Sequence, residues 1–179
     1  RQEESLKAWL RNKGKGCIEG CTGYGKTRIG LNAIERVRTK YPNLSVIVVV
    51  PTDVLREQWI KQLDKRGLGL NCKVSIINTA SKQIDQCDLL ILDEIHKFAA
   101  DQFSHVFKTV KYKLILGLTA TIERLDGKHE LIKKYCPVVD TVPIEVAKVN
   151  GWVSDFTEYQ VIITADDIDN YRQYNKEFI

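Results

Sequence analysis

Six short apolar runs, most of them rich in valine and isoleucine, recur along the chain and predict six β-strands. Runs such as SVIVVV and LLIL are almost continuously apolar, which is typical of strands buried on both faces of a parallel sheet. The predicted strands are Gly16 to Glu19, Ser45 to Val50, Lys73 to Ile77, Leu89 to Asp93, Lys113 to Leu118 and Pro137 to Val142.

Apolar residues between these runs recur at the three- and four-residue steps of a helix. Leu55, Trp59 and Leu63, for example, follow one another at four-residue steps. The alternation of strands and helices predicts an α/β fold, in which a mostly parallel sheet is sandwiched between helices. The predicted helices are Glu3 to Asn12, Thr27 to Lys40, Val54 to Lys65 and Lys128 to Tyr135.

The pattern changes after about Asp140. Pro143, a polar stretch around Asn150, the strand-like YQVIIT and a charged helical pattern from Asp166 to Phe178 follow. We therefore expect one domain over residues 1–140 and a connector over residues 141–179. The last helical pattern has no capping glycine, and the sequence contains no methionine. We expect the chain to be a piece of a longer protein, in which another domain follows the connector.

Composition narrows the class of protein. The 179 residues are 44% hydrophobic and 28% charged, as in soluble globular domains. No apolar run approaches the roughly 20 residues of a membrane span. We expect the protein in the cytoplasm of a bacterium or of a phage-infected host, or in the nucleus of a eukaryote. The net charge of +4 permits binding to a polyanion without requiring it. Five cysteines form no CxxC pair and are expected to be reduced thiols rather than metal ligands.

The segment GCTGYGKT fits the GxxxxGK[ST] pattern of a phosphate loop and lies between a predicted strand and a predicted helix. Its glycines let backbone N–H groups face a di- or triphosphate, and the start of the helix adds partial positive charge. In this pattern Lys26 reaches the β- and γ-phosphates, and the Thr27 hydroxyl ligates Mg²⁺. A chance glycine-rich turn is the alternative. The predicted nucleotide-binding residues are Gly20, Cys21, Thr22, Gly23, Tyr24, Gly25, Lys26 and Thr27.

Two adjacent carboxylates, Asp93 and Glu94, follow the apolar run LLIL in the tetrapeptide DEIH. A carboxylate at the end of a parallel strand faces the crevice where such sheets bind ligands. Asp93 can there hold Mg²⁺, directly or through water, while Glu94 orients and deprotonates the water that attacks the γ-phosphate. Alone, such a pair is more often a solvated turn or a helix cap. The phosphate loop upstream favours the catalytic interpretation.

Four segments in this order, GCTGYGKT, VVVPTDVLREQW, DEIH and LGLTAT, resemble the motifs of superfamily 2 helicases and translocases. The chain is similar in particular to XPB-like and UvsW-like DNA helicases and to the motor subunits of restriction enzymes. The resemblance covers Gln2 to about Asp140 well. It implies the first RecA-like domain of a P-loop NTPase that uses ATP and Mg²⁺. It also implies that His96 joins Lys26, Asp93 and Glu94 as a catalytic residue.

The opening segment RQEESLKAW resembles the helix that precedes the phosphate loop in this family. By this resemblance Gln2 reads the adenine base and Trp9 packs in the interior. The arginine of the family pattern lies further upstream and would precede Arg1. The alternative for Gln2 is an exposed side chain near a chain end.

The same resemblance places Pro51 and Thr52 on the backbone of a nucleic acid. A hydroxyl and the N–H groups at a helix start can contact phosphates there without reading the base sequence. Asn78 and Thr79 match another backbone-contact position of the family, although a helix cap explains these two residue types equally well.

Thr119, Ala120 and Thr121 match the family segment that couples ATP hydrolysis to movement of nucleic acid. Small hydroxyl side chains suit such a switch, because they can exchange hydrogen bonds with the DEIH segment between nucleotide states. A cap between a strand and a turn is the alternative interpretation of these residues.

The resemblance implies a motor that moves on or unwinds DNA, single- or double-stranded, and that needs arginines from a second RecA-like domain for fast hydrolysis. We therefore expect this segment to bind nucleotide but to hydrolyse it slowly. A DEAH-type RNA helicase is the nearest alternative, because backbone contacts can hold either nucleic acid. A P-loop ATPase that is not a nucleic-acid motor, and a binding module without hydrolysis, are the alternatives from other classes.

Overall fold

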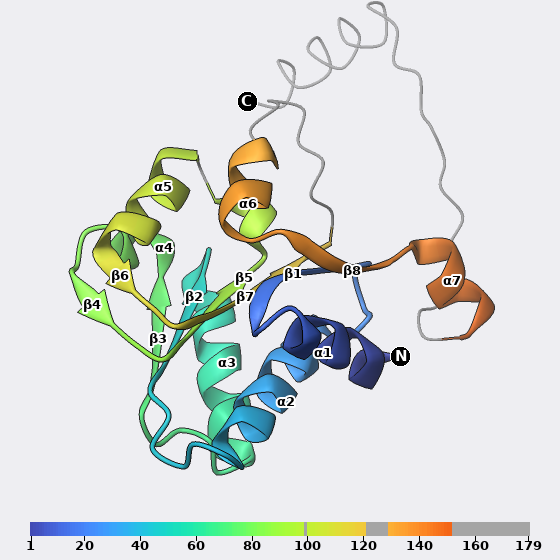
Figure 1. Cartoon of the computed structure of the whole chain (residues 1–179), viewed down its shortest axis with the longest axis horizontal. Helices are drawn as coiled ribbons and strands as arrows, with labels where there is room; N and C mark the ends of the chain where they lie inside the picture. Colours follow the sequence, from blue (N-terminus) through green and yellow to red (C-terminus); the bar gives the residue numbers. More distant parts are fainter. Residues whose placement is uncertain (99, 121–128, 152–179) are drawn as a thin grey trace, which may run out of the picture.

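The computed structural model describes residues 1–98, 100–120 and 129–151 (Figure 1). Its helices are α1 (Gln2–Arg11), α2 (Lys26–Arg38), α3 (Asp53–Lys65), α4 (Ile77–Ala80), the 3₁₀ helix η1 (Ile95–Lys97), α5 (Ala100–Thr109), α6 (His129–Tyr135) and α7 (Ile144–Val149). Its strands are β1 (Lys15–Gly20), β2 (Val46–Val50), β3 (Cys72–Ile76), β4 (Asp85–Gln86), β5 (Leu89–Asp93), β6 (Val110–Lys111), β7 (Leu114–Thr119) and β8 (Val138–Val142).

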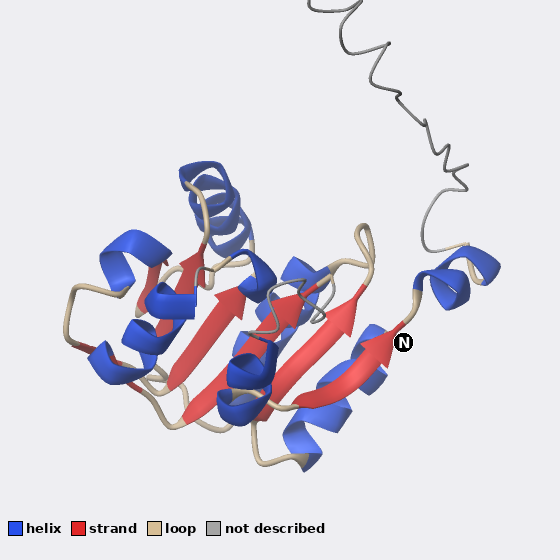
Figure 2. Cartoon of the chain, turned by 90° about the horizontal axis from the view of Figure 1, so that it is seen from above, coloured by secondary structure: helices blue, strands red, loops and turns tan. Residues whose placement is uncertain are grey.

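Six of these strands form one sheet in the order β3-β2-β5-β7-β1-β8, and every neighbouring pair is parallel (Figure 2). The short strands β4 and β6 pair separately. Every residue of β2 and of β5 is buried, because helices cover both faces of the sheet. This burial explains why the two strands read as unbroken apolar runs, and it confirms the predicted fold class.

The two faces of the sheet carry separate hydrophobic cores. Helices α1, α2 and α3 lie on one face, and α4, α5 and α6 lie on the other (Figure 1). Successive side chains of a strand point to opposite faces. In β2, Val46, Val48 and Val50 accordingly join the core under α1 to α3, whereas Ile47 and Val49 join the core under α4 to α6.

The structure confirms the six predicted strands and four predicted helices, mostly with limits that shift by one or two residues. The strand predicted to reach Ile77 ends one residue earlier, because Ile77 begins α4. The periodic patterns did not predict α4, α5, α7, η1 or the short strands β4 and β6. Lys128, the strand-like YQVIIT and the pattern from Asp166 to Phe178 lie outside the described residues. Within the described ranges, no helix has the length and apolar character that a membrane crossing requires.

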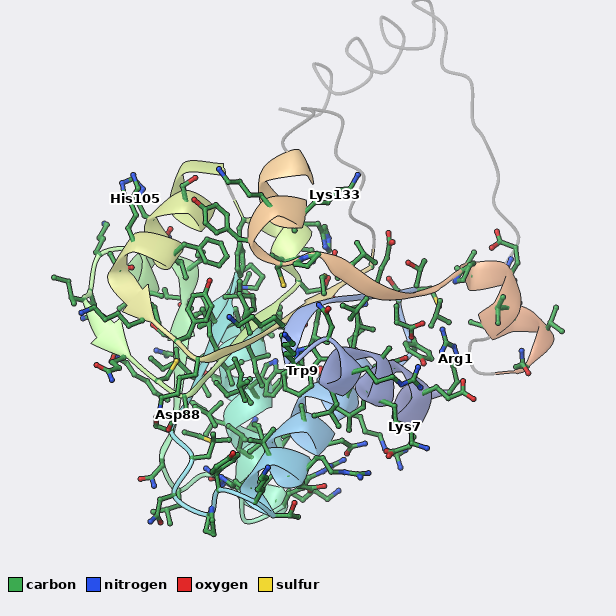
Figure 3. All side chains as sticks on the ribbon, viewed as in Figure 1. Arg1, Lys7, Trp9, Asp88, His105 and Lys133 are labelled. Atoms are coloured by element: carbon green, nitrogen blue, oxygen red, sulfur yellow. The ribbon has the colours of Figure 1, made fainter. Side chains whose placement is uncertain are left out.

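Asp88 forms hydrogen bonds that connect the amino ends of three neighbouring strands, β5, β2 and β7 (Figure 3). Its Oδ2 accepts hydrogen bonds from the backbone N–H of Ser45 at 3.0 Å and from the Ser45 hydroxyl at 2.8 Å. Its Oδ1 accepts one from Lys113 Nζ at 2.7 Å. These contacts lie just before β5, β2 and β7. They lower the pKa of Asp88 to about 2, with the Lys113 hydrogen bond the largest cause.

We predict that Asp88→Asn lowers the free energy of unfolding by about 1 kcal/mol near neutral pH, because an amide cannot replace every carboxylate contact. The depressed pKa means that this contribution is present above the ordinary Asp pKa of about 3.9 and is lost as the pH falls towards about 2. Urea unfolding at a series of pH values between these limits would show the wild type converging on the variant. A difference that stays constant down to the lowest pH would contradict this role for Asp88. Lys113→Ala, which keeps both Ser45 contacts but removes the largest cause of the lowered pKa, should show a smaller pH dependence than the wild type.

Candidate nucleotide-binding and hydrolysis site

The predicted site segments meet at one edge of the sheet. Because all six strands are parallel, their carboxyl ends lie along this edge. The phosphate loop follows β1, the DEIH segment begins at the last residue of β5, and the TAT segment begins at the last residue of β7. Pro51 and Thr52 follow β2 directly. Open α/β sheets bind their ligands beyond this edge.

The phosphate loop combines two glycines in the left-handed backbone region with a buried tyrosine. Gly23 and Gly25 have φ angles of 85° and 88°, and Gly25 is the residue from which α2 starts. The Tyr24 ring is buried, and its hydroxyl lies 3.1 Å from Ser5 Oγ of α1. A Cβ on Gly20 would lie 2.6 Å from this ring. Tyr24 therefore supports the loop from the protein interior, and only its backbone remains to face a nucleotide.

Lys26 is the first residue of α2, and its side chain is 7% exposed. Its ammonium group donates a hydrogen bond to the backbone oxygen of Gly20 at 3.1 Å and lies 3.6 Å from Glu94 Oε1. The lysine side chain thus contacts both the first residue of its own loop and Glu94, the residue that follows β5. Thr27, half-buried, is the next residue of α2.

Asp93 is 2% exposed and accepts two hydrogen bonds, one on each oxygen. Trp59 Nε1 donates to Oδ2 at 2.7 Å, and the Glu94 backbone N–H donates to Oδ1 at 3.0 Å. Burial raises the pKa of the Asp93 carboxyl above its ordinary value, while the Trp59 hydrogen bond opposes that rise. The charge of Glu94 adds to the rise, and the charge of Lys26 opposes it. A cation beside Asp93 would favour the ionised form.

Glu94 has a backbone conformation that is rare for a residue with a side chain. Its φ of 52° lies in the left-handed region, as do those of Lys13 and Asn71, and such outliers cluster at functional sites. Its Oε1 faces Lys26, and its Oε2 lies 3.3 Å from His96 Nδ1. Within the described part of the chain, this buried Oε2 accepts no hydrogen bond. Glu94 precedes η1 but its side chain does not cap that helix. The helix-cap alternative therefore holds for the position of Glu94 at the N-cap of η1, but not for its side chain, which makes no capping hydrogen bond there.

His96 connects the DEIH segment to β7. Its Nδ1 lies 2.8 Å from the Oγ1 of the buried Thr119. The expected hydrogen bond between the DEIH and TAT segments is therefore present, although its exchange between nucleotide states stays a prediction. Ala120 follows at the end of the strand, and Thr121 lies outside the described residues.

Gln2 lies against the phosphate loop. Its Nε2 donates a hydrogen bond to the backbone oxygen of Tyr24 at 2.7 Å, and a Cβ on Gly25 would lie 2.5 Å from the same nitrogen. Helix α1 is held in place by Trp9, which is fully buried as expected and whose Nε1 donates to the Ile115 oxygen at 2.8 Å. A role for Gln2 in adenine recognition stays a prediction.

The residues predicted to contact nucleic acid lie at the same edge of the sheet. The Thr52 hydroxyl is exposed and caps α3, where it accepts a hydrogen bond from the Leu55 N–H at 3.4 Å. Pro51 is half-buried. Asn78 and Thr79 lie inside α4, whose N-cap is Ile76, so the helix-cap alternative for these two residues is wrong. Their contact with nucleic acid stays a prediction.

The chemistry of the side chains at this edge is compatible with a magnesium ion that is shared with phosphates. Within residues 1–98, 100–120 and 129–151, no three His, Cys, Asp or Glu side chains come together as a metal cluster of their own. Magnesium in nucleotide sites is held by one or two protein oxygens, by phosphate oxygens and by water. The Asp93 carboxylate and the Thr27 hydroxyl supply oxygen atoms of the kind that such an ion takes.

The family described as "Type III restriction enzyme, res subunit" matches residues 1–83 and 70–124. These two segments together span more than half of the 179 residues. The chain belongs to this family. The resemblance to the first motor domain of superfamily 2 helicases and translocases is thereby confirmed, and the chain is a helicase-type ATP-binding domain.

Curated relatives of this restriction-enzyme and helicase family include a protein of Sulfurisphaera tokodaii described as DNA 3'-5' translocase XPB2. It is 32% identical over 146 residues, which cover 73% of this chain and 32% of the relative. A putative ATP-dependent RNA helicase of African swine fever virus is 29% identical over 164 residues, covering 78% of this chain and 31% of the viral protein. The chain thus spans about a third of the length of these relatives.

Solved structures share the fold at low sequence identity. The UvsW helicase of bacteriophage T4 aligns with a TM-score of 0.66 at 16% identity, covering 78% of this chain and 58% of that one. A type ISP restriction-modification enzyme, LlaGI, in complex with a DNA substrate mimic aligns with a TM-score of 0.69 at 16% identity, covering 84% and 20%. Both likenesses confirm the RecA-like arrangement of the sheet and helices.

Proposed function

We propose that this chain is the ATP-binding half of a DNA helicase or translocase, and that its edge site binds Mg·ATP and carries the hydrolytic residues. The observation that carries the proposal is the chain of contacts from the phosphate-loop Lys26 to Glu94, from Glu94 to His96, and from His96 to Thr119. These contacts connect the residues expected at the γ-phosphate to the segment expected to move with nucleic acid.

Each residue of the site has a proposed role. The phosphate-loop backbone and Lys26 bind the β- and γ-phosphates, and Thr27 and Asp93 hold Mg²⁺. When bound, the ion neutralises charge on the transferred phosphoryl group. Glu94 orients the attacking water and accepts its proton on a carboxylate oxygen. His96 relays the state of this site to Thr119.

The proposed partners are DNA and a second RecA-like domain of the same polypeptide. DNA is favoured over RNA because the translocase relative is named for DNA, whereas the viral relatives are named as putative RNA helicases at slightly lower identity. We propose that residues 1–140 form the motor domain and that residues 141–179 lead to the second domain. Arginines supplied by such a domain raise hydrolysis rates by about 10³ to 10⁵ in comparable enzymes.

The proposal is tested by the ATPase rate of the longest polypeptide that contains this chain. The rate is measured at fixed salt with single-stranded DNA, duplex DNA, branched DNA and RNA, because salt alone changes binding to any polyanion. We expect strong stimulation by DNA and little by RNA. Stimulation by RNA alone would make the protein an RNA helicase, and no stimulation by any nucleic acid would contradict the motor function.

A further inference from the structure

Trp59 connects α3 to the carboxylate proposed to hold magnesium. Its indole is fully buried, and Nε1 donates to Asp93 Oδ2 at 2.7 Å. A buried tryptophan usually finds a partner for its N–H group. The partner here is a charged side chain at the functional edge of the sheet. The other oxygen of Asp93 accepts the backbone N–H of Glu94, so the two donors hold the carboxylate from different elements.

The indole ring packs closely against its neighbours, and this packing fixes the orientation of the ring. A Cβ on Gly30 of α2 would lie 2.5 Å from Trp59 Cη2, so the ring packs directly against the backbone of that helix. The same hypothetical Cβ on Gly30 would lie 3.3 Å from Leu118 of β7. Because close-packed side chains have little room to turn, the N–H group keeps a constant direction towards Asp93.

We propose that Trp59 is a positioning residue that orients Asp93 for the magnesium ion of the bound nucleotide, an inference that rests on the proposed function of the site. Without this donor, Asp93 would keep only the contact from the Glu94 N–H and could turn away from the ion. Loss of a hydrogen-bond partner of a metal ligand typically lowers metal affinity about 10- to 100-fold.

The chain offers a matched control for this proposal. Trp9 is also fully buried, and its Nε1 also donates a short hydrogen bond, but to the backbone oxygen of Ile115 in β7 (Figure 3). Ile115 lies next to Leu114, the first residue of that strand, whereas the site lies beyond its last residue. Trp9→Phe and Trp59→Phe therefore remove the same group and the same ring from two interior positions, and only one of these positions contacts Asp93.

The experiment measures the affinity of each variant for a fluorescent ATP analogue, first in EDTA and then with saturating Mg²⁺. The ratio of the two dissociation constants is the metal-dependent gain. We expect Trp59→Phe to reduce this gain about tenfold, towards the value of Asp93→Asn, while its affinity in EDTA stays within about twofold of the wild type. Trp9→Phe should leave both quantities within about twofold of the wild type.

The possible outcomes separate the two proposals. A wild-type chain that binds no nucleotide, or gains nothing from Mg²⁺, would contradict the proposed function itself. A wild type with a clear gain, together with a Trp59→Phe variant that behaves like Trp9→Phe, would overturn only the positioning role. A Trp59→Phe variant that also loses affinity in EDTA would show that the indole serves the fold as a whole, and this result too would overturn the inference.

A second measurement covers the case in which Trp59→Phe does not fold. The sequence contains three tryptophans, so Trp9→Phe combined with Trp152→Phe leaves Trp59 as the sole indole. Addition of Mg²⁺ to the nucleotide-bound form should then change the emission of Trp59, because its hydrogen-bond partner acquires a cation. The same protein carrying Asp93→Asn should show no such change. If the emission of Trp59 does not change with Mg²⁺ in the protein that retains Asp93, the proposed role of Trp59 is overturned.

Discussion

Glu94→Gln is expected to lower the rate of ATP hydrolysis by about 10² to 10⁴ while leaving the affinity for Mg·ATP within about threefold. Glutamine has the shape of glutamate, and its amide oxygen can still face Lys26, which lies 3.6 Å from Glu94 Oε1. The amide cannot accept a proton from water, so the substitution removes the base and little else. Single-turnover hydrolysis in the longest polypeptide containing this chain measures the loss.

The control for this substitution is Glu57→Gln, which makes the same change on the exposed side of α3. It should leave both the rate and the affinity unaltered. A Glu94→Gln variant that hydrolyses ATP within about threefold of the wild type would place the base on another residue. An equal loss of affinity and of rate would indicate that Glu94 serves mainly to hold Lys26 in place.

The sheet could be predicted from sequence because its strands are buried on both faces. Such strands need apolar residues at every position, as β2 and β5 show, so each reads as an unbroken run. The site segments follow the same logic, since a phosphate loop and an acidic pair placed directly after such runs must lie at the carboxyl edge of a parallel sheet. Local pattern and position along the strand were sufficient for these predictions.

Some local structure was missed although the sequence carried a signal for it. In α5, Phe103, Val106, Phe107 and the following Val110 recur at helical steps. Tyr24 is predicted to bind nucleotide as part of the phosphate loop, and the structure adds that its ring is buried beneath the loop against Ser5. Its position inside a phosphate-loop pattern concealed that packing role.

Contacts between distant parts of the chain could not be predicted from one sequence. Trp59 and Asp93 are 34 positions apart, and the spacing of Leu55, Trp59 and Leu63 indicated only that Trp59 faces the interior. The structure does bury Trp59, whereas the partner of the indole N–H depended on how α3 lies against β5. The contact between His96 and Thr119 was expected only through the resemblance to helicases.

Helix α3 connects the proposed nucleic-acid contact with the proposed magnesium ligand, although the two belong to separate sequence motifs. It begins beside Thr52, which is proposed to contact the nucleic-acid backbone, and about two turns later it carries Trp59. Because Trp59 donates directly to Asp93, a displacement of α3 by bound nucleic acid would act on the proposed magnesium ligand without any intermediate residue. This path is distinct from the one that runs from Glu94 through His96 to Thr119.

Lys26→Ala is expected to weaken binding of Mg·ATP by this chain about 100-fold, which corresponds to about 2.7 kcal/mol. The ammonium group is nearly buried beside the Gly20 oxygen and Glu94, where the attraction to a phosphate is stronger than it would be in water. No other described side chain of the phosphate loop supplies a positive charge. Equilibrium binding of a fluorescent ATP analogue measures the loss.

The matched control for this prediction is Lys40→Ala, which removes an exposed lysine just beyond the opposite end of α2. It should bind the analogue as the wild type does. Because Lys26→Ala also leaves Glu94 without its cation, urea unfolding of each variant is needed to show that the chain stays folded. A folded Lys26→Ala variant that binds within about threefold of the wild type would contradict the assignment of the phosphate loop. The roles proposed for Asp93 and Glu94 would then fail as well, because both depend on a phosphate held beside them.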